Sequence, residues 1–266
     1  MCLTLAGCRQ GGWTAMTRPF NEAVARRHAQ QAERLSDRGD EAGAAEAYEA
    51  ALDHDPQNAV LHAEAAAVYA RRGQVDFAVG HYQAAVRADS NNAEYALALA
   101  ETLMRHAENS VDRRELLKAA ERAYAHARWL APERLDAALG SARCLRQLGR
   151  MTEAAQVLRE AERLDPSSPA VHIELASIEE EMGNADAALG EYGQALKLDP
   201  DNVTAHNACG LLNLEMSRRM GSQRPLARER AVAHFRKSLE VDPNQPRICE
   251  HLSQLESTFA EATTTD

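Results

Sequence analysis

The sequence predicts an all-α fold, a solenoid of six helix-turn-helix repeats followed by a C-terminal capping helix. Three observations predict it. A 34-residue period returns six times between Ala25 and Gln245, and a period of that length is typical of stacked repeats. Small residues recur in register within every block. Apolar residues follow helical spacing, whereas the period-two alternation of a strand is absent.

Three positions of each block are always small. The blocks start at Ala25, Ala59, Ala93, Leu135, Pro169 and Val203. The eighth position is Ala32, Ala66, Ala100, Ala142, Ala176 and Gly210. The twentieth is Ala44, Ala78, Ala120, Ala154, Ala188 and Ala231, and the twenty-seventh is Ala51, Ala85, Ala127, Ala161, Ala195 and Ser238. Helices approach closely where facing side chains are small, so we expect these residues at the contact between paired helices.

A large side chain stands one helical turn after the twentieth position, at Tyr48, Tyr82, Tyr124, Leu158, Tyr192 and Phe235, and it is expected to fill the space beside the alanines. Four blocks carry glycine at the fifteenth position, Gly39, Gly73, Gly149 and Gly183. Glycine there predicts a left-handed residue that ends the first helix. Asp-Pro pairs such as Asp55-Pro56 close most blocks and end the second helix.

Repeats three and six are longer than the others, by eight and nine residues. The excess falls around residues 106–113 and 217–225, between the first and second helices of these repeats. Insertions of this kind tend to emerge on one face of a solenoid. We therefore expect a second binding edge there. After Pro246, the stripe of Ile248, Leu252, Leu255 and Phe259 predicts the capping helix.

The small, small, small, aromatic and proline pattern resembles the tetratricopeptide repeat family over about four fifths of the chain. The resemblance implies a right-handed superhelix whose first helices line a concave groove. It also implies a non-enzymatic scaffold or adaptor that binds a peptide or a partner helix in that groove. Glycine-rich phosphate loops, nucleophile elbows and HExxH sequences are absent, and we expect neither catalysis nor a cofactor.

The resemblance places the groove at six positions of each first helix. The candidate partner-binding residues there are Glu33, Glu64, Arg71, Glu94, Glu101, Arg105, Arg143, Arg146, Glu174, Glu181 and Glu215. Apolar residues are interleaved at Leu97, Met104, Leu139, Ile173, Leu211 and Leu214. The acidic excess predicts an amphipathic partner with basic residues. Some family members clamp a chaperone's carboxylate tail with lysine and asparagine, and this chain has Ala29, Glu33, Ala63 and Ala67 instead.

A basic stretch in repeat six is a secondary candidate surface, centred on Arg218, Arg219 and Arg224. It could bind an anionic partner or lipid headgroups. An ordinary solvated helix face is the alternative. The chain as a whole is acidic, with 30 Lys and Arg against 40 Asp and Glu and a net charge of −10. This balance argues against nucleic-acid binding.

Histidines and cysteines are expected to have structural roles. His28, His62, His172 and His206 share the fourth block position, so they lie in different repeats, too far apart to share a metal ion. Cys144, Cys209 and Cys249 show no metal-ligand spacing and are expected to be small buried hydrophobes.

The N-terminal residues Leu5-Ala6-Gly7-Cys8 resemble a bacterial lipobox, which implies lipidation of Cys8. Only four residues precede the box, too few for a secretion signal. Two interpretations stay open: the true start lies upstream and the protein is a lipid-anchored factor of the cell envelope, or the match is fortuitous and the protein is cytoplasmic. A cytoplasmic adaptor or the regulatory, substrate-recruiting subunit of a separate enzyme is the alternative function. We divide the chain into a flexible segment 1–20, the repeats 21–245, and the capping helix with a disordered tail 246–266.

Overall fold

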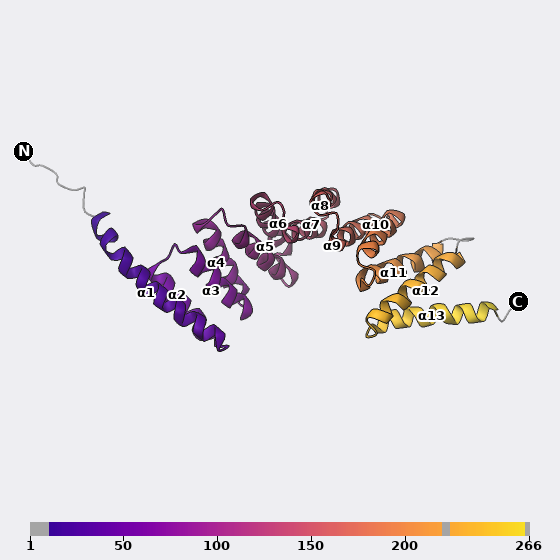
Figure 1. Cartoon of the computed structure of the whole chain (residues 1–266), viewed down its shortest axis with the longest axis horizontal. Helices are drawn as coiled ribbons and strands as arrows, with labels where there is room; N and C mark the ends of the chain where they lie inside the picture. Colours follow the sequence, from indigo (N-terminus) through magenta and orange to yellow (C-terminus); the bar gives the residue numbers. More distant parts are fainter. Residues whose placement is uncertain (1–10, 220–223, 264–266) are drawn as a thin grey trace, which may run out of the picture. The chain divides into compact units, whose positions relative to one another are not determined.

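The computed structural model describes the backbone of residues 11–219 and 224–263, and the side chains of residues 19–218 and 225–257. These residues form thirteen helices and no strand (Figure 1). Their contacts divide the chain into two compact units, Met1–Gly140 and Ser141–Asp266, with the boundary inside helix α7 (Leu135–Gln147). The predicted all-α fold of helix-turn-helix repeats is confirmed.

The first unit contains three helix pairs and the start of α7. The pairs are α1 (Gly11–Asp37) with α2 (Glu41–His54), α3 (Ala59–Arg71) with α4 (Val75–Ala88), and α5 (Ala93–Glu108) with α6 (Arg113–Leu130). The two helices of each pair lie side by side (Figure 1). Adjacent pairs pack through α2 against α3 and through α4 against α5.

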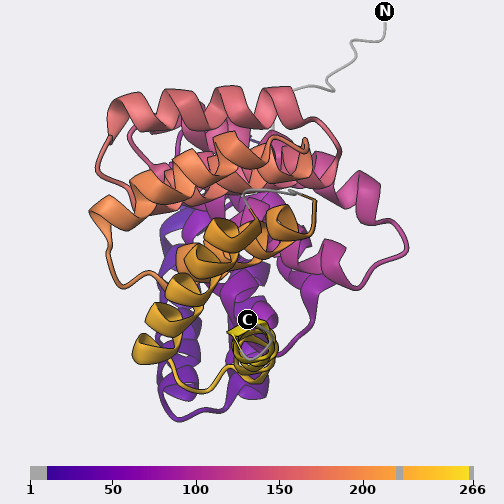
Figure 2. The same cartoon turned by 90° about the vertical axis from the view of Figure 1, so that its right-hand side faces the viewer.

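The second unit contains the end of α7, helix α8 (Met151–Leu164), two further pairs and a last single helix. The pairs are α9 (Pro169–Glu181) with α10 (Ala185–Leu198) and α11 (Val203–Arg219) with α12 (Arg224–Val241). The last helix, α13 (Pro246–Thr263), packs on α12, and Figure 2 shows it nearly end-on beside α12. Its inward residues Ile248 and Leu255 are buried, whereas Glu250 and Gln254 are exposed. This division is the one expected of a capping helix.

Turn chemistry explains where several helices begin or end. Asn58 caps α3, because its Oδ1 accepts the backbone N–H groups of Val60 and Leu61 at 3.1 and 3.2 Å. Asn92 caps α5 in the same way. First helices end at glycines with φ between +73° and +82°, namely Gly39, Gly73, Gly149 and Gly183. The predicted left-handed stop is confirmed at all four positions.

The two long repeats lack that glycine, and their helices continue for about one further turn. The equivalent residues are Ala107 and Ser217, both helical and buried. Helix α5 has 16 residues and α11 has 17, against 13 in α3 and α9. Their partners α6 and α12 have 18 residues each, against 14 in α4. The extra residues therefore lengthen both helices of the pair, and in repeat three they leave a connection of four residues, 109–112, between α5 and α6.

The predicted contact positions form the core of each unit. Every alanine at the eighth, twentieth and twenty-seventh positions is at most 2% exposed, and Gly210 and Ser238 are buried too. The large residues of the twenty-fourth position are buried with them, from Phe235 at 0% to Tyr82 at 9%. In unit 2, Phe235 packs with Val232, Ile248 and Leu255, so the core continues into the capping helix.

The ends of the chain are described only in part. Helix α1 begins at Gly11 and so extends into the segment 1–20 that the sequence analysis treats as flexible. Cys8 and the lipobox lie outside the described residues, as do residues 264–266 of the expected tail. None of the helices in the described part of the chain combines the length and the apolar character that a membrane span requires.

Candidate functional site

The first helices of unit 1 carry an acidic patch, which we define as Glu33 on α1, Glu64 on α3 and Glu101 on α5. Glu33 and Glu101 are exposed, and Glu64 is half-buried. Glu64 accepts a hydrogen bond from the Tyr48 hydroxyl. Burial raises the pKa of Glu64, and the neighbouring charge of Glu33 adds to that effect, while the Tyr48 bond opposes it. Two negative charges therefore approach each other on this surface.

Tyrosine hydroxyls underlie the patch. Burial raises the pKa of Tyr48 and of Tyr82, and nearby carboxylates raise both further: Glu64 and Glu33 at Tyr48, Glu101 at Tyr82. These phenols remain protonated at neutral pH, and the Tyr48 hydroxyl donates a hydrogen bond to Glu64. The patch thus places carboxylates over two buried tyrosines.

Arginines flank the acidic patch, and Arg71 is already committed to other residues. Its guanidinium donates to both carboxylate oxygens of Glu41, at 2.8 and 3.0 Å, and to Ser36 Oγ at 2.8 Å. Arg105 is exposed on α5 and contributes a positive charge near Tyr82. Among the described residues, Glu33, Glu64 and Glu101 form no ion pair with lysine or arginine.

Glu94 does not belong to this unpaired set. It forms an ion pair with Arg134. Arg134 also binds Asp136, with 2.7 Å between Arg134 Nη2 and Asp136 Oδ2. Arg134 thus holds two carboxylates, and it lowers the pKa of Asp136. Glu94 is a predicted groove residue, but its pairing with Arg134 could not be predicted from the sequence, because Glu94 and Arg134 are 40 positions apart.

In unit 2 the candidate groove residues bind one another. Arg143 Nε donates to Glu174 Oε1 at 2.5 Å, and Arg146 pairs with Glu181 and lies 3.8 Å from Glu174. Glu174 is 8% exposed, and its ion pair with Arg143 links α9 to α7. Glu215 is exposed at the end of α11.

The interleaved apolar residues differ in exposure. Leu211 on α11 is 41% exposed and is available to a partner. Met104, Leu139, Ile173 and Leu214 are half-buried. Leu97 is buried at 6%, so the prediction that it lines the groove is wrong.

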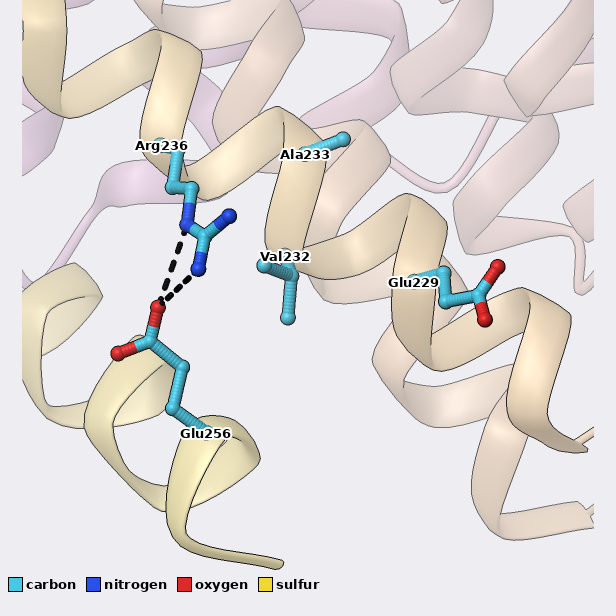
Figure 3. A pocket seen from close by; sticks show the side chains of 5 residues that line it. All are labelled: Glu229, Val232, Ala233, Arg236 and Glu256. Atoms are coloured by element: carbon cyan, nitrogen blue, oxygen red, sulfur yellow. Dashed lines mark hydrogen bonds and ion pairs between the residues drawn. The ribbon is translucent and has the colours of Figure 1, made fainter. Parts of the chain in front are cut away.

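The basic stretch of repeat six is partly neutralised. Arg236 on α12 donates to Glu256 Oε1 on α13 from both Nε and Nη2, at 3.2 and 2.7 Å (Figure 3). Lys237 pairs with Asp201 at 3.0 Å. Arg218 is exposed, while the side chains of Arg219 and Arg224 lie outside the described residues.

A pocket of about 640 Å³ lies beside the Arg236–Glu256 pair, lined by Glu229, Val232, Ala233, Arg236 and Glu256 (Figure 3). Opposite charges alternate with two apolar side chains along its wall. It offers no excess of positive charge, so it adds no support to an anion-binding edge.

The fourth-position histidines make contacts within their own repeats that the sequence analysis did not find. His62 Nδ1 lies 3.1 Å from His81 Nδ1, and His206 Nδ1 lies 3.0 Å from His234 Nδ1. His172 Nδ1 lies 2.9 Å from Glu191. The partners His81, Glu191 and His234 all stand at the twenty-third block position. A polar residue at this position, in the same block as a histidine at the fourth position, is the sequence pattern that indicates these pairs.

In the described residues, no group of three or more His, Cys, Asp or Glu side chains is arranged to hold a metal ion. Cys144 and Cys209 are buried, and burial raises the pKa of Cys209 to about 11. Cys249 is exposed on α13, so the expectation that it is buried is wrong.

A sequence profile of the tetratricopeptide repeat matches residues 29–93 and 97–169, and a second profile, TPR repeat, matches residues 177–217. A 99-residue segment, 37% of this chain, is 31% identical to the Protein CTR9 homolog of Arabidopsis thaliana. The match spans 9% of that protein's length.

Solved structures share the fold at low sequence identity. PilF of Pseudomonas aeruginosa is 18% identical, with a TM-score of 0.61 over 88% of this chain and 99% of PilF. YrrB, described as a TPR protein with an unusual peptide-binding site, is also 18% identical, with a TM-score of 0.55 over 79% of this chain and 99% of YrrB. The repeat pattern, the helix pairs and the profile matches agree, and the chain belongs to the tetratricopeptide repeat family.

Proposed function

We propose that this protein is a non-enzymatic interaction scaffold that binds a basic, amphipathic peptide segment on the acidic patch of unit 1. A scaffold for protein–protein interaction is the function that the repeat fold supports. The observation that carries the finer proposal is the contrast between the acidic patch and the paired carboxylates of unit 2. Glu33, Glu64 and Glu101 have no cationic partner among the described residues, whereas Glu174 and Glu181 are bound by Arg143 and Arg146.

Charge and solvation favour a cationic partner at this patch. Glu64 is half-buried beside another carboxylate, and its raised pKa shows that its negative charge is under-compensated. A lysine or arginine of the partner would supply the missing charge in a partly desolvated place, where charge-assisted bonds are strongest. Extended peptides and helices docked in grooves are recurrent modes of peptide recognition, and the neighbour YrrB has a peptide-binding site.

The test uses one amphipathic peptide sequence in net positive, neutral and net negative versions, titrated against the full chain by fluorescence anisotropy. The triple variant Glu33→Gln, Glu64→Gln, Glu101→Gln should weaken the positive peptide at least tenfold, since losing about 1.4 kcal/mol changes an equilibrium constant tenfold. The neutral and negative versions should bind weakly to both proteins.

A matched control removes three other acidic side chains of the same unit, Glu46→Gln, Asp53→Asn and Glu133→Gln, all of them exposed. It changes the net charge equally but leaves the acidic patch intact, so it should retain affinity for the positive peptide. Equal losses in the two triple variants would show that net charge alone attracts the peptide, and the proposed patch would then be rejected.

We also propose, on the residues Leu5-Ala6-Gly7-Cys8, that Cys8 anchors the scaffold to a membrane as a lipoprotein. Mass spectrometry of the protein from its native cells tests this proposal directly. A lipid-modified N-terminal cysteine would support an envelope assembly factor. An unmodified Cys8 would favour the alternatives, a cytoplasmic adaptor or the recruiting subunit of a separate enzyme.

A further inference from the structure

Repeats one and two are connected by a chain of hydrogen bonds that contains two histidines. His62 on α3 lies with Nε2 3.1 Å from the Pro56 carbonyl oxygen and with Nδ1 3.1 Å from His81 Nδ1 on α4. The other nitrogen of His81, Nε2, lies 3.0 Å from Glu49 Oε1 on α2. The Tyr69 hydroxyl donates to the same oxygen at 2.8 Å.

The acceptors in this chain determine how many protons it contains. A backbone carbonyl only accepts, so His62 Nε2 must carry a proton. An ionised Glu49 also only accepts, so His81 Nε2 must carry a second one. The short contact between the two Nδ1 atoms requires a third proton between them, because two bare nitrogens repel. Two neutral imidazoles hold two protons, so this pair holds one extra proton and one positive charge.

The two histidines of the pair have different surroundings. His62 is half-buried, and desolvation lowers its pKa, with the charges of His81 and Arg87 adding to the effect, although the bond to Pro56 opposes it. His81 instead faces the Glu49 carboxylate of α2 and stacks on the Tyr69 ring of α3, with 5.3 Å between centroids. Helix α5 also forms an ion pair with α4, between His106 Nε2 and Asp76 Oδ1 at 3.5 Å, but neither residue belongs to the His62–His81 chain of bonds.

The network can exchange its proton with solvent. His62 lines a pocket of about 560 Å³ with Pro56 and Arg87. Glu49 has a side chain that is 45% exposed, at the opposite end of the chain of bonds. Solvent therefore reaches both ends, while His81, 14% exposed, is the shielded member.

Repeat six provides an internal comparison. His206 Nε2 lies 2.9 Å from the Pro200 carbonyl oxygen, and its Nδ1 faces His234 Nδ1, as in repeat two. The charge of Arg230, a cation, acts on the His234 ring, whereas the His81 ring of repeat two contacts the anion Glu49. Burial lowers the pKa of His234, and His206 and Arg230 lower it further. One proton on His206 Nε2 and one between the two Nδ1 atoms satisfy all of these contacts. Two neutral imidazoles hold two protons, so this pair is neutral.

We propose that the His62–His81–Glu49 network is a proton-dependent lock that fastens helix α2 of repeat one to repeat two. With its extra proton, the network makes all of its bonds. When that proton leaves at higher pH, His81 keeps a single N–H and can donate either to Glu49 or to His62, but not to both. One bond of the network is lost, and the packing of α2 against α3 and α4 loosens.

Histidine side-chain ¹⁵N NMR of the full-length wild-type protein tests the proton count without any variant that might fail to fold. His81→Gln and His234→Gln serve only to assign the signals. Near pH 7 we expect the His62–His81 pair to show a ring protonated at both nitrogens, and the His206–His234 pair to show two neutral rings. Two neutral rings in repeat two would overturn the proposal.

A double-mutant cycle with Glu49→Gln and His81→Gln tests the mechanical role. The coupling between the two residues in thermal unfolding should be clearly larger near pH 6 than near pH 9, because the neutral His81 divides its single N–H between Glu49 and His62. Amide exchange of α2 should also be faster at the higher pH than intrinsic rates explain. Glu46→Gln on α2 is the control and should show no such coupling. A coupling that does not change with pH would identify an ordinary structural hydrogen bond and would exclude a lock.

Discussion

At the scale of single residues, two helical glycines show how closely packed this chain is. A Cβ atom on Gly210 would lie 2.4 Å from Phe235 Cε1, and one on Gly140 would lie 2.3 Å from Tyr124 Cε1. Each aromatic ring therefore occupies the space that a side chain would need. Gly210, at the small eighth position, and Gly140 are thus steric requirements of the neighbouring ring.

We expect Gly210→Ala to destabilise the protein by about 1–3 kcal/mol, because the added methyl group overpacks the contact with Phe235. Gly190→Ala is the matched control, since nothing lies within 4 Å of a Cβ at that helical position. It should stabilise by about 0.5–1 kcal/mol through helix propensity alone. Urea unfolding of both variants checks the prediction, and the same sign for both changes would contradict it.

The raised pKa of Glu64 predicts that binding of a basic peptide depends on pH. Only the ionised carboxylate attracts the peptide, so affinity should fall as the pH drops through the raised pKa. The effect of Glu64 on the stability of the fold runs the other way: because its pKa is raised in the folded state, its contribution to the free energy of unfolding increases as the pH falls. Peptide titrations at several pH values should show the loss in the wild type and a flatter profile in Glu64→Gln.

At the scale of helices, the glycine at the fifteenth position decides helix length. Where it is present, the first helix ends with φ near +80°, as at Gly39 and Gly183. Where Ala107 or Ser217 stands instead, the helix continues and its partner lengthens with it. A residue without a low-energy left-handed conformation cannot make this stop.

Replacing Gly183 by alanine should cost about 1–2 kcal/mol, because alanine is strained at φ +82°. Asparagine adopts the left-handed region more readily than alanine, so Gly183→Asn should lose clearly less. Thermal unfolding of the two variants gives the comparison. Equal losses would mean that the turn is held by contacts other than the glycine's conformation.

At the scale of the whole chain, consecutive helix pairs pack on each other within each unit, and the last pair also packs on the capping helix α13. Ile248 and Leu255 cover Val232 and Phe235 of α12. The outer side of α13 carries polar residues such as Glu250 and Ser253. Stacked repeats need such a polar end to remain soluble.

Deleting residues 246–266 should expose the apolar side of α12, lower the solubility and speed amide exchange in α11 and α12. Exchange in α1 to α4 should not change, because repeat stability is transmitted between neighbours. Ser253→Lys, on the exposed side of α13, should leave solubility and exchange unchanged. Faster exchange in α1 to α4 of the truncated protein would instead indicate one cooperative structure.

The sequence by itself determined the all-α class, the six helix pairs, the glycine stops and the buried small and aromatic positions. These features could be read from it because they repeat every 34 residues and depend on contacts within a repeat or between neighbours. Tertiary structure decided which groove charges remain unpaired, that the extra residues of repeats three and six lengthen helices, and that His62 pairs with His81. The reason is physical: ion pairs such as Arg143 with Glu174, 31 residues apart, depend on side-chain distances between helices of different repeats, and a repeat pattern gives the helices without giving those distances.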